Sequence, residues 1–394
     1  MDRAAQPAAE LMERDLHHWQ MLAVFQEVLA EVCQRRKLHQ SFADPRRTLG
    51  CAPYLSLFLF GLFNPVVKTM RGLCAMSRLP RVQQATGCAH VSLGSFSETQ
   101  AVIDPHVLEE VFKELFQRTP SSKAPDRRLA DLNVVLQDGS LWRALPRMAW
   151  AEYGVGPTGE AKGVRLHLRF HLVEDKPLRA KVAPGKSCER QALRELCVAG
   201  QTNVGDRYYG EDYQLFGDID QARGFFVFRI KEDAVLNVEE ELPLSAEDRA
   251  AGVVRQVWAR LGAREAHRSI RVRVVEIRTA DQHLLLVTNL PLERAPAELI
   301  GFIYRRRWTI ELFFRWIKCI LGCRHFFAES PAGVAIQLYL ALIAALLFQG
   351  FTGQRPTKRQ MELIQLYFMG WATAQDLSRC FEEQRAKAAA AKKR

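Results

Sequence analysis

The sequence lacks a long hydrophobic run, a nucleotide-binding P-loop and an export signal. Its longest apolar stretch, residues 334–348, includes Gln337 and is shorter than the ~20 apolar residues that a membrane-spanning helix needs. We therefore expect a helix buried in a core there, and no membrane partner. Because no G-x-x-x-x-G-K-S/T motif occurs, ATP-driven chemistry is not indicated. The start is polar and acidic, unlike a signal peptide.

The nine cysteines show no regular spacing, and their number is odd. A disulfide framework or a zinc ribbon would need paired spacings, so we expect free thiols in a reducing cytoplasm. Cys319, Cys323 and His325 are close together, but a zinc site would need a fourth ligand nearby. Buried thiols are the simpler interpretation.

Acidic residues are fewer than basic ones: 44 Asp and Glu stand against 55 Lys and Arg, a formal net charge of +11. This surplus favours polyanionic partners, because neutralised phosphates release their counterions. It does not identify the partner. With 394 residues, 48% of them hydrophobic, the chain is long enough for two or three domains with a well-buried core.

Residues 1–125 have mainly helical apolar spacing, with a helix beginning at Asp104-Pro105 and a linker near residues 119–125. From residue 129 onwards the pattern changes to short strands and helices. We predict strands at residues 132–136, 164–173, 178–182, 225–230, 270–277 and 284–290, and helices at 187–197, 213–222, 250–261 and 297–320. In residues 164–173 Arg and His alternate with Leu and Phe, so we expect His167 and His171 on the exposed face of a half-buried strand.

The most informative segment is residues 304–318, which combine a charged stripe with an apolar surround. On one continuous helix, the side chains of the stripe fall within about 80° of arc; they are Tyr304, Arg307, Glu311, Arg315 and Lys318. A buried stripe needs partners for its charges. A metal-bound carboxylate beside phosphate-binding cations would supply them. A structural ion-pair stripe, with Glu311 bridging two arginines, explains the spacing equally well.

Two aspartates could complete such a metal site. Metal-assisted phosphoryl transfer needs carboxylates from distant parts of the chain that converge on cations about 3.5–4 Å apart. Asp138 ends the predicted strand 132–136 and precedes Gly139, although an ordinary Asp-Gly turn has the same pattern. Asp206 follows the predicted helix 187–197; Asp212 and Asp218 are weaker substitutes for it.

The stripe matches the Y-x-x-R-x-x-x-E-x-x-x-x-x-x-K signature of a large group of bacterial insertion-sequence DDE transposases at Tyr304, Arg307, Glu311 and Lys318. Asp138-Gly-Ser and Asp206-Arg-Tyr resemble the first and second aspartate motifs of that family. The resemblance covers roughly residues 90–350. One departure is the polar segment 201–204, where the family has an apolar strand.

The resemblance implies an α/β fold: a ribonuclease-H-like mixed sheet flanked by helices, with a β-rich insertion before the glutamate helix. The implied regions are a helical DNA-end-binding region (1–125), the catalytic core in two parts (126–231 and 297–350), the insertion (232–296) and a basic helical C-terminal region (351–394).

The resemblance also implies a cut-and-paste transposase in the bacterial cytoplasm, associated with the nucleoid. Asp138, Asp206 and Glu311 would ligate two Mg²⁺ or Mn²⁺ ions, while Tyr304, Arg307 and Lys318 would hold phosphates of the terminal strand. Arg315 ranks lower, and Trp308 would either stack on an unpaired base or pack in the core.

The implied partners are double-stranded DNA, as terminal inverted repeats and as target, and a second copy of the chain in a synaptic complex. Two alternatives stay open. One is a related nuclease without strand transfer, and the other is a non-catalytic DNA-binding protein descended from a transposase.

Overall fold

The computed structural model describes residues 20–37, 49–64, 66–121, 127–156, 159–264, 269–280, 283–368 and 371–392. The chain divides into two compact units, which we describe separately. Unit 1 comprises residues 1–122, 142–151 and 315–394, and unit 2 comprises residues 123–141 and 152–314. These units do not coincide with the five regions predicted from the sequence. The start of the chain, residues 1–19, and residues 122–125 of the predicted linker lie outside the described residues.

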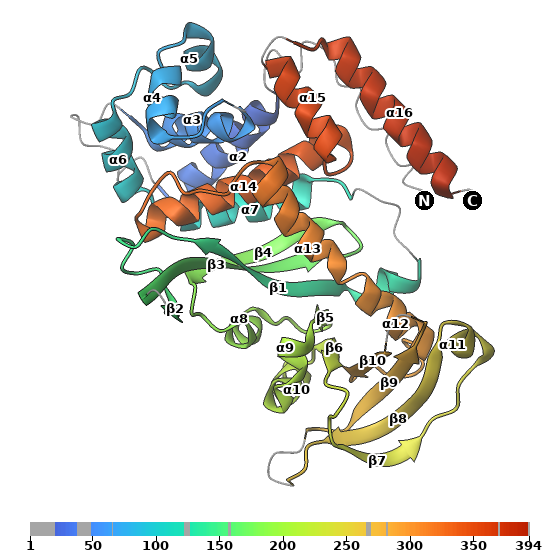
Figure 1. The fold of residues 1–394 in the computed structure, drawn as a ribbon. Coiled ribbons are helices and arrows are strands. Elements are labelled where there is room, and N and C mark those ends of the chain that lie inside the picture. Colours follow the sequence, from blue (N-terminus) through green and yellow to red (C-terminus); the bar gives the residue numbers. More distant parts are fainter. Residues whose placement is uncertain are drawn as a thin grey trace. The chain divides into compact units, whose positions relative to one another are not determined.

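Unit 2 is built on a mixed β-sheet (Figure 1). Its strands are β1 (Val134–Arg143), β2 (Glu152–Gly156), β3 (Gly159–His171), β4 (Lys176–Pro184), β5 (Thr202–Gly205), β6 (Phe225–Ile230), β7 (Leu236–Glu241), β8 (Val253–Leu261), β9 (Val272–Arg278) and β10 (His283–Thr288). The order is β2-β3-β1-β5-β6-β10-β9-β8-β7, with β4 beside β3. β1, β5 and β6 are parallel, whereas the β3–β4, β6–β10 and β7–β8–β9–β10 pairings are antiparallel.

Helices pack on both faces of this sheet. They are η2 (Arg127–Leu132), α8 (Glu189–Leu196), α9 (Arg207–Gly210), α10 (Tyr213–Gln221), α11 (Ala246–Ala250), α12 (Ala297–Arg305) and α13 (Trp308–Arg315). On one face Phe216 of α10 stacks on Phe226 of β6 with ring centroids 4.8 Å apart. On the other face Gly301 of α12 lies against Ile277 of β9. A sheet covered on both sides needs apolar residues in successive positions, as in the fully buried run Phe226–Phe228.

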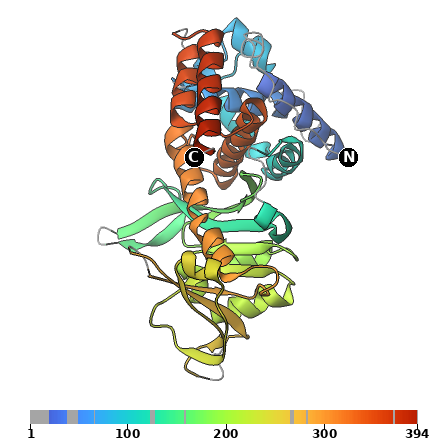
Figure 2. The same ribbon diagram turned by 90° about the vertical axis from the view of Figure 1, so that its right-hand side faces the viewer.

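The β-rich insertion continues the same sheet rather than forming a separate one, as the yellow and brown strands in Figures 1 and 2 show. The prediction of a helix at residues 250–261 is wrong, because α11 ends at Ala250 and β8 follows. Val253, Val257 and Leu261 recur every four residues, a spacing that suits both a helix and one face of a strand. All three are buried in β8.

Unit 1 is helical. Its helices are α2 (Gln20–Arg35), α3 (Cys51–Phe63), α4 (Met70–Met76), α5 (Pro80–Thr86), α6 (Leu93–Val102), α7 (His106–Arg118), the π-helical turn η4 (Trp316–Ile320), α14 (Pro331–Thr352), α15 (Lys358–Phe368) and α16 (Ala374–Lys392). By length and composition α14 could cross a membrane, but 83% of its most apolar window is buried inside the protein. It packs against α3 through Phe63 and Phe348, as a core helix does.

The predicted exposed face of strand 164–173 is also wrong. His167 and Arg169 are 4% and 1% exposed, because α8 covers this face of β3. Some of their polar atoms are hydrogen-bonded instead of solvated: His167 Nε2 lies 2.8 Å from Ser187 Oγ, and Arg169 Nη2 donates to Asn203 Oδ1 at 3.2 Å. His167 Nδ1 and Arg169 Nε are buried without a hydrogen-bond partner. Polar side chains with partners can be buried on the second face of a sheet.

Two boundaries near the candidate site differ from the prediction. β1 does not end at Asp138 but continues to Arg143, so Asp138 lies within a strand and not in a turn. The predicted helix 297–320 is interrupted at Arg306-Arg307, where Arg307 N–H donates to Tyr304 O and Ile310 N–H donates to Arg307 O. These i to i−3 bonds tighten the backbone. The angular stripe calculated for one continuous helix therefore does not extend unbroken from Tyr304 to Glu311.

The burial of His167 predicts a pH dependence of stability. Burial, followed by the nearby charge of Arg165, lowers the pKa of His167 to about 4. In the unfolded state His167 keeps an ordinary pKa of ~6.5. Between pH ~6.5 and about 4 the unfolded state therefore binds more protons than the folded state, so the free energy of unfolding decreases as the pH falls through this range. The loss is at most about 1.4 kcal/mol per pH unit.

We expect His167→Gln to flatten this pH dependence in urea unfolding followed by circular dichroism. The exposed His325 supplies the matched control, His325→Gln, which should keep the wild-type slope. Equal slopes for wild type and His167→Gln would contradict the assignment.

Candidate active site

Asp138 lies in β1, and Asp206 directly follows the parallel neighbour β5 at the matching position. The register of β1 and β5 pairs Leu136 with Val204, and each aspartate comes two residues later. Because side chains alternate along a strand, positions two residues apart share a face of the sheet. Asp206 is also the N-cap of α9, where its side chain accepts a hydrogen bond from Tyr208 N–H at 2.9 Å. The two carboxylates are electrostatically coupled.

The polar segment before Asp206 is a buried strand despite its composition. Asn203 in β5 accepts a hydrogen bond from Gln137 Nε2 at 3.0 Å and donates one to Phe225 O at 3.0 Å. Thr202 Oγ1 donates to Leu132 O at 2.7 Å. A satisfied polar network is compatible with burial and fixes the strand register. Although the segment 201–204 is polar, residues 202–205 still form the strand that precedes Asp206.

The short helix α9 lies tightly against β6. A Cβ on Gly210 would lie 1.9 Å from the carbonyl oxygen of Arg229, so only glycine allows this approach. Tyr209 fills the space beneath, with its ring stacked 5.7 Å from that of Phe228. This packing fixes the start of α9, and with it Asp206.

The carboxylate of Asp138 is largely desolvated and has other acids nearby. Burial, then the charge of Glu189, raises its pKa to about 7, while the Gly139 N–H and Arg307 act in the opposite direction. The ionised form is thus poorly compensated by the protein alone. A divalent cation would supply the missing charge, so the donor set fits a hard cation that prefers oxygen ligands.

Glu311 is joined to these acids through Arg307. Arg307 Nη2 lies 2.5 Å from Glu311 Oε1, one turn along α13, and the same guanidinium is attracted to Asp138. The Arg307–Glu311 ion pair, which the alternative of a structural ion-pair stripe predicts, is therefore present. Within the described ranges, no three His, Cys, Asp or Glu side chains are close enough together to enclose a metal ion. Asp138 and Asp206 are brought together, and Glu311 stands apart on its arginine.

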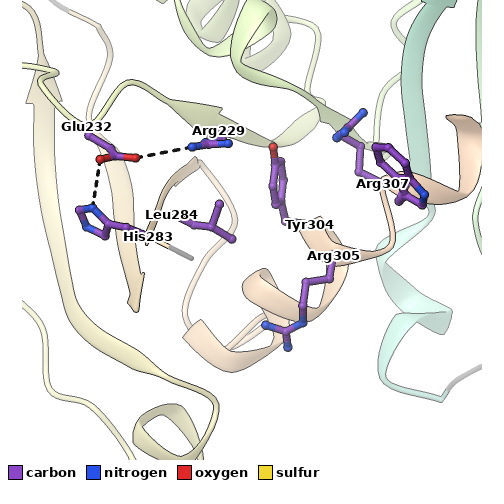
Figure 3. Close-up of a pocket in the computed structure, with 8 residues that line it drawn as sticks. Arg229, Glu232, His283, Leu284, Tyr304, Arg305 and Arg307 are labelled. Atoms are coloured by element: carbon purple, nitrogen blue, oxygen red, sulfur yellow. Dashed lines mark ion pairs between the residues drawn. The ribbon is translucent and has the colours of Figure 1, made fainter. Parts of the chain in front are cut away.

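A cavity of about 650 Å³ opens beside Arg307 (Figure 3). Tyr304 and Arg305 line it from α12, while Arg229 and His283 line it from β6 and β10. Glu232 pairs with both Arg229 and His283, as the dashed lines in Figure 3 mark. Trp308 lies at this cavity with half of its surface exposed, so the core-packing interpretation of Trp308 is wrong.

A second cavity of about 480 Å³ lies beside Asp206 and shares Arg229, Tyr304 and Arg307 with the first. Burial raises the pKa of Tyr304, so its hydroxyl stays protonated and can donate a hydrogen bond. Arg229 lines both cavities, but its sequence context gave no signal of this. A lone arginine in a strand has many structural explanations.

The remaining predicted residues differ in their surroundings. Lys318 belongs to unit 1, where its Nζ lies 4.2 Å from the centre of the Trp142 ring. That ring is buried, and its Nε1 donates to Cys323 O at 2.8 Å. Arg315, also in unit 1, is exposed.

The two substitute aspartates are engaged elsewhere in unit 2. Arg194 pairs with Asp212 at 2.9 Å and with Asp218 at 2.6 Å. Asp212 also caps α10 by accepting from Leu215 N–H. These contacts account for both side chains as structural groups, and Asp206 is the better second aspartate.

Carboxylates beside arginines, a protonated tyrosine and an exposed tryptophan can together bind a phosphate ester and a divalent cation. Comparison with known proteins agrees with this chemistry. The family described as "Transposase DDE domain" matches residues 130–347, more than half of the chain. The chain therefore belongs to the transposase DDE domain family.

Individual relatives carry similar names. "Probable transposase for insertion sequence element IS5377" of Geobacillus stearothermophilus is 31% identical over 215 residues, 54% of each chain. "Putative transposase y4zB" of Sinorhizobium fredii is 29% identical over 195 residues, 48% of this chain and 54% of that protein. The chain thus spans about half the length of these curated relatives.

A solved structure of a piggyBac transposase synaptic complex with hairpin DNA is also matched. The match covers 94% of this chain and 81% of that one, with 9% identity and a TM-score of 0.43.

The charge imbalance at Asp138 predicts that Asp138→Asn stabilises the protein. Because its folded pKa lies above the unfolded value, ionised Asp138 destabilises the fold fully above pH 7, and less as pH falls towards ~4. At pH 8 we expect a gain of about 1 to 4 kcal/mol in the free energy of unfolding. Added Mn²⁺ should raise the melting temperature of the wild type but not of Asp138→Asn.

The exposed Asp233 supplies the control. Asp233→Asn should leave both the stability and the response to Mn²⁺ unchanged. An Asp138→Asn variant that melts below the wild type without metal would show that the carboxylate is stabilising.

Proposed function

We propose that the chain is a DNA transposase that binds the ends of a mobile element, cleaves DNA strands and joins the 3′-hydroxyl ends to target DNA. The observation that carries this proposal is the pair of aspartates at matching positions beyond the paired residues of parallel β1 and β5, together with the poorly compensated charge of Asp138. Family membership supports the same reaction class. A cation-dependent reaction on phosphate esters uses such a pair directly.

The fold supports a finer assignment to the ribonuclease-H-like group with the Tyr-Arg-Glu-Lys signature. The first aspartate is on β1, the second follows β5 after α8, and the glutamate is on α13, which is the order that the group has. Parallel strands β1, β5 and β6 next to the antiparallel pair β3–β4 support the mixed sheet that this assignment requires.

Asp138, Asp206 and Glu311 would hold two Mg²⁺ or Mn²⁺ ions. The bound ions would activate the attacking water or 3′-hydroxyl and stabilise the leaving oxygen. Asp138 and Asp206 are already adjacent in register, whereas Glu311 first has to separate from Arg307. We therefore propose that the Arg307–Glu311 ion pair breaks when the site is assembled.

Arg307 can exchange partners when DNA binds. Its guanidinium has five donors and binds phosphate as well as carboxylate. A phosphate near Tyr304 and Arg307 would take over the guanidinium and release the Glu311 carboxylate. The terminal strand would thereby help to assemble its own site, and Tyr304 would donate its hydroxyl hydrogen to the same phosphate.

Other residues would contact DNA as well. Trp308 is exposed and adjoins Arg307, so it can stack on an unpaired base. Lys318 and the lower-ranked Arg315 would bind phosphates. The Nζ of Lys318 lies over the ring of Trp142. Each would add to affinity without specifying sequence.

The proposal extends to the rest of the chain. The helical region 1–125 would bind the terminal inverted repeats, with the core at 126–231 and 297–350, the insertion at 232–296 and the basic region at 351–394. The formal charge of +11 supports DNA as the partner. A homodimer in the synaptic complex and a location in the bacterial cytoplasm complete it; nine free cysteines support a reducing compartment.

The central test is Glu311→Gln. We expect this variant to bind element-end DNA with wild-type affinity but to lose strand cleavage by at least 100-fold, because the amide cannot bind a cation as a carboxylate does. The same change at the exposed Glu247 of α11 is the matched control and should cleave normally. Cleavage by Glu311→Gln within a few-fold of wild type would exclude the metal role.

The products separate this function from its alternatives. Incubation of wild-type protein with element-end DNA, target DNA and Mg²⁺ should give joined products. Cleaved ends without joining would indicate a nuclease, and binding without cleavage would indicate a DNA-binding protein only.

A further inference from the structure

A third acid, Glu189, lies beside the two aspartates but belongs to none of the motifs. It is the first residue of α8, and its side chain is only 13% exposed. Both carboxylate oxygens have partners: Oε1 pairs with Arg165, and Oε2 accepts from the Tyr209 hydroxyl at 3.3 Å. Because Tyr209 is 3% exposed and packed on β6, Glu189 is fixed in position.

The Glu189 carboxyl group lies directly against the backbone next to Asp138. A Cβ added to Gly139 would come within 2.7 Å of both Cδ and Oε1 of Glu189. No other residue at position 139 would leave this space, and Gly139 here is in a regular strand, where glycine is otherwise unfavourable. The close approach of Glu189 therefore explains why position 139 is a glycine.

The contact affects the aspartates and not only Arg165. Glu189 is the strongest of the charged influences on Asp138, and it is repelled by Asp206 as well. A cavity of about 10 Å³ lined by Asp138, Glu189 and Tyr209 is close to the size that one water needs. If Glu189 served only to pair with Arg165, it would not need to lie against Gly139 and Asp138.

We propose that Glu189 is a positioning residue of the metal centre: fixed by Arg165 and Tyr209 against Gly139, it adds the negative charge that gives Asp138 and Asp206 their affinity for a divalent cation. This role rests on the proposed function, because it needs a cation at the two aspartates. Mutation of a residue that contacts metal ligands without binding the metal itself typically lowers metal affinity about 10- to 100-fold.

The test is Mn²⁺ binding to the full chain without DNA, measured by electron paramagnetic resonance of the free ion. We expect Glu189→Gln to weaken binding by about 10- to 100-fold. The matched control is Glu195→Gln on the same helix, whose carboxylate pairs with Lys181 at the surface. It should bind Mn²⁺ like the wild type.

Glu189→Gln leaves Arg165 without its partner, so the double variant Arg165→Gln/Glu189→Gln removes both charges and protects the fold. It should melt normally and still bind Mn²⁺ weakly. Gly139→Ala should also weaken binding, because it displaces the carboxyl group. If it acts through Glu189, combining it with Glu189→Gln should add nothing further.

The outcomes separate the two proposals. Equal Mn²⁺ affinity in wild type, Glu189→Gln and the double variant would overturn the role of Glu189 while leaving the proposed function standing. A wild type that binds no Mn²⁺, or binds it as well after Asp138→Asn, would overturn the metal centre itself and this role with it.

Discussion

Partly buried negative charge where β1 and β5 lie side by side is the constraint on which the site depends. Asp138 and Asp206 are adjacent because their strands are parallel neighbours, and Glu189 approaches from α8. Buried carboxylates normally take up protons or acquire cationic partners. Here the nearest guanidinium, Arg307, is shared with Glu311. The protein thus maintains a deficit of positive charge, and under the proposed function divalent ions and phosphates are balanced against it.

Hydrogen bonds and close packing hold the two aspartates in place. The polar network of Gln137, Asn203 and Arg169 fixes the register of β1 and β5. Gly210 allows α9 to lie on β6, which orients the N-cap Asp206. The glutamate is held differently, on a helix that begins just after a break at Arg306-Arg307. Under the proposed function, this break lies next to the arginine that exchanges partners, and the site is completed when the substrate binds.

Much of the fold could be predicted from hydrophobic periodicity, and the candidate residues from their order along the chain. Strand 225–230 and helix 213–222 agree closely with β6 and α10. Failures arose where one pattern fits two structures. Val253, Val257 and Leu261 suit a helix or a strand, and pairing with β9 decides for the strand. His167 looked solvent-exposed because alternation reveals polarity but not whether a helix covers that face.

The site could be predicted only in part, for a similar reason. The motifs single out Asp138, Asp206 and Glu311 as candidates, but spacing cannot show that Glu311 pairs with Arg307 and that, among the described residues, the three acids do not form a metal-binding cluster. Nor does any local pattern mark Glu189 or Arg229, because both make contacts with residues far away in the chain. Long-range contacts of this kind have no counterpart in helical or strand periodicity.

The most direct measurement is anomalous scattering from Mn²⁺ in crystals of the full chain bound to element-end DNA. The account predicts Mn²⁺ between Asp138 and Asp206, with Glu311 moved from Arg307 onto a metal and Arg307 on a DNA phosphate. Mn²⁺ elsewhere, or Glu311 still paired with Arg307 in the DNA complex, would contradict it.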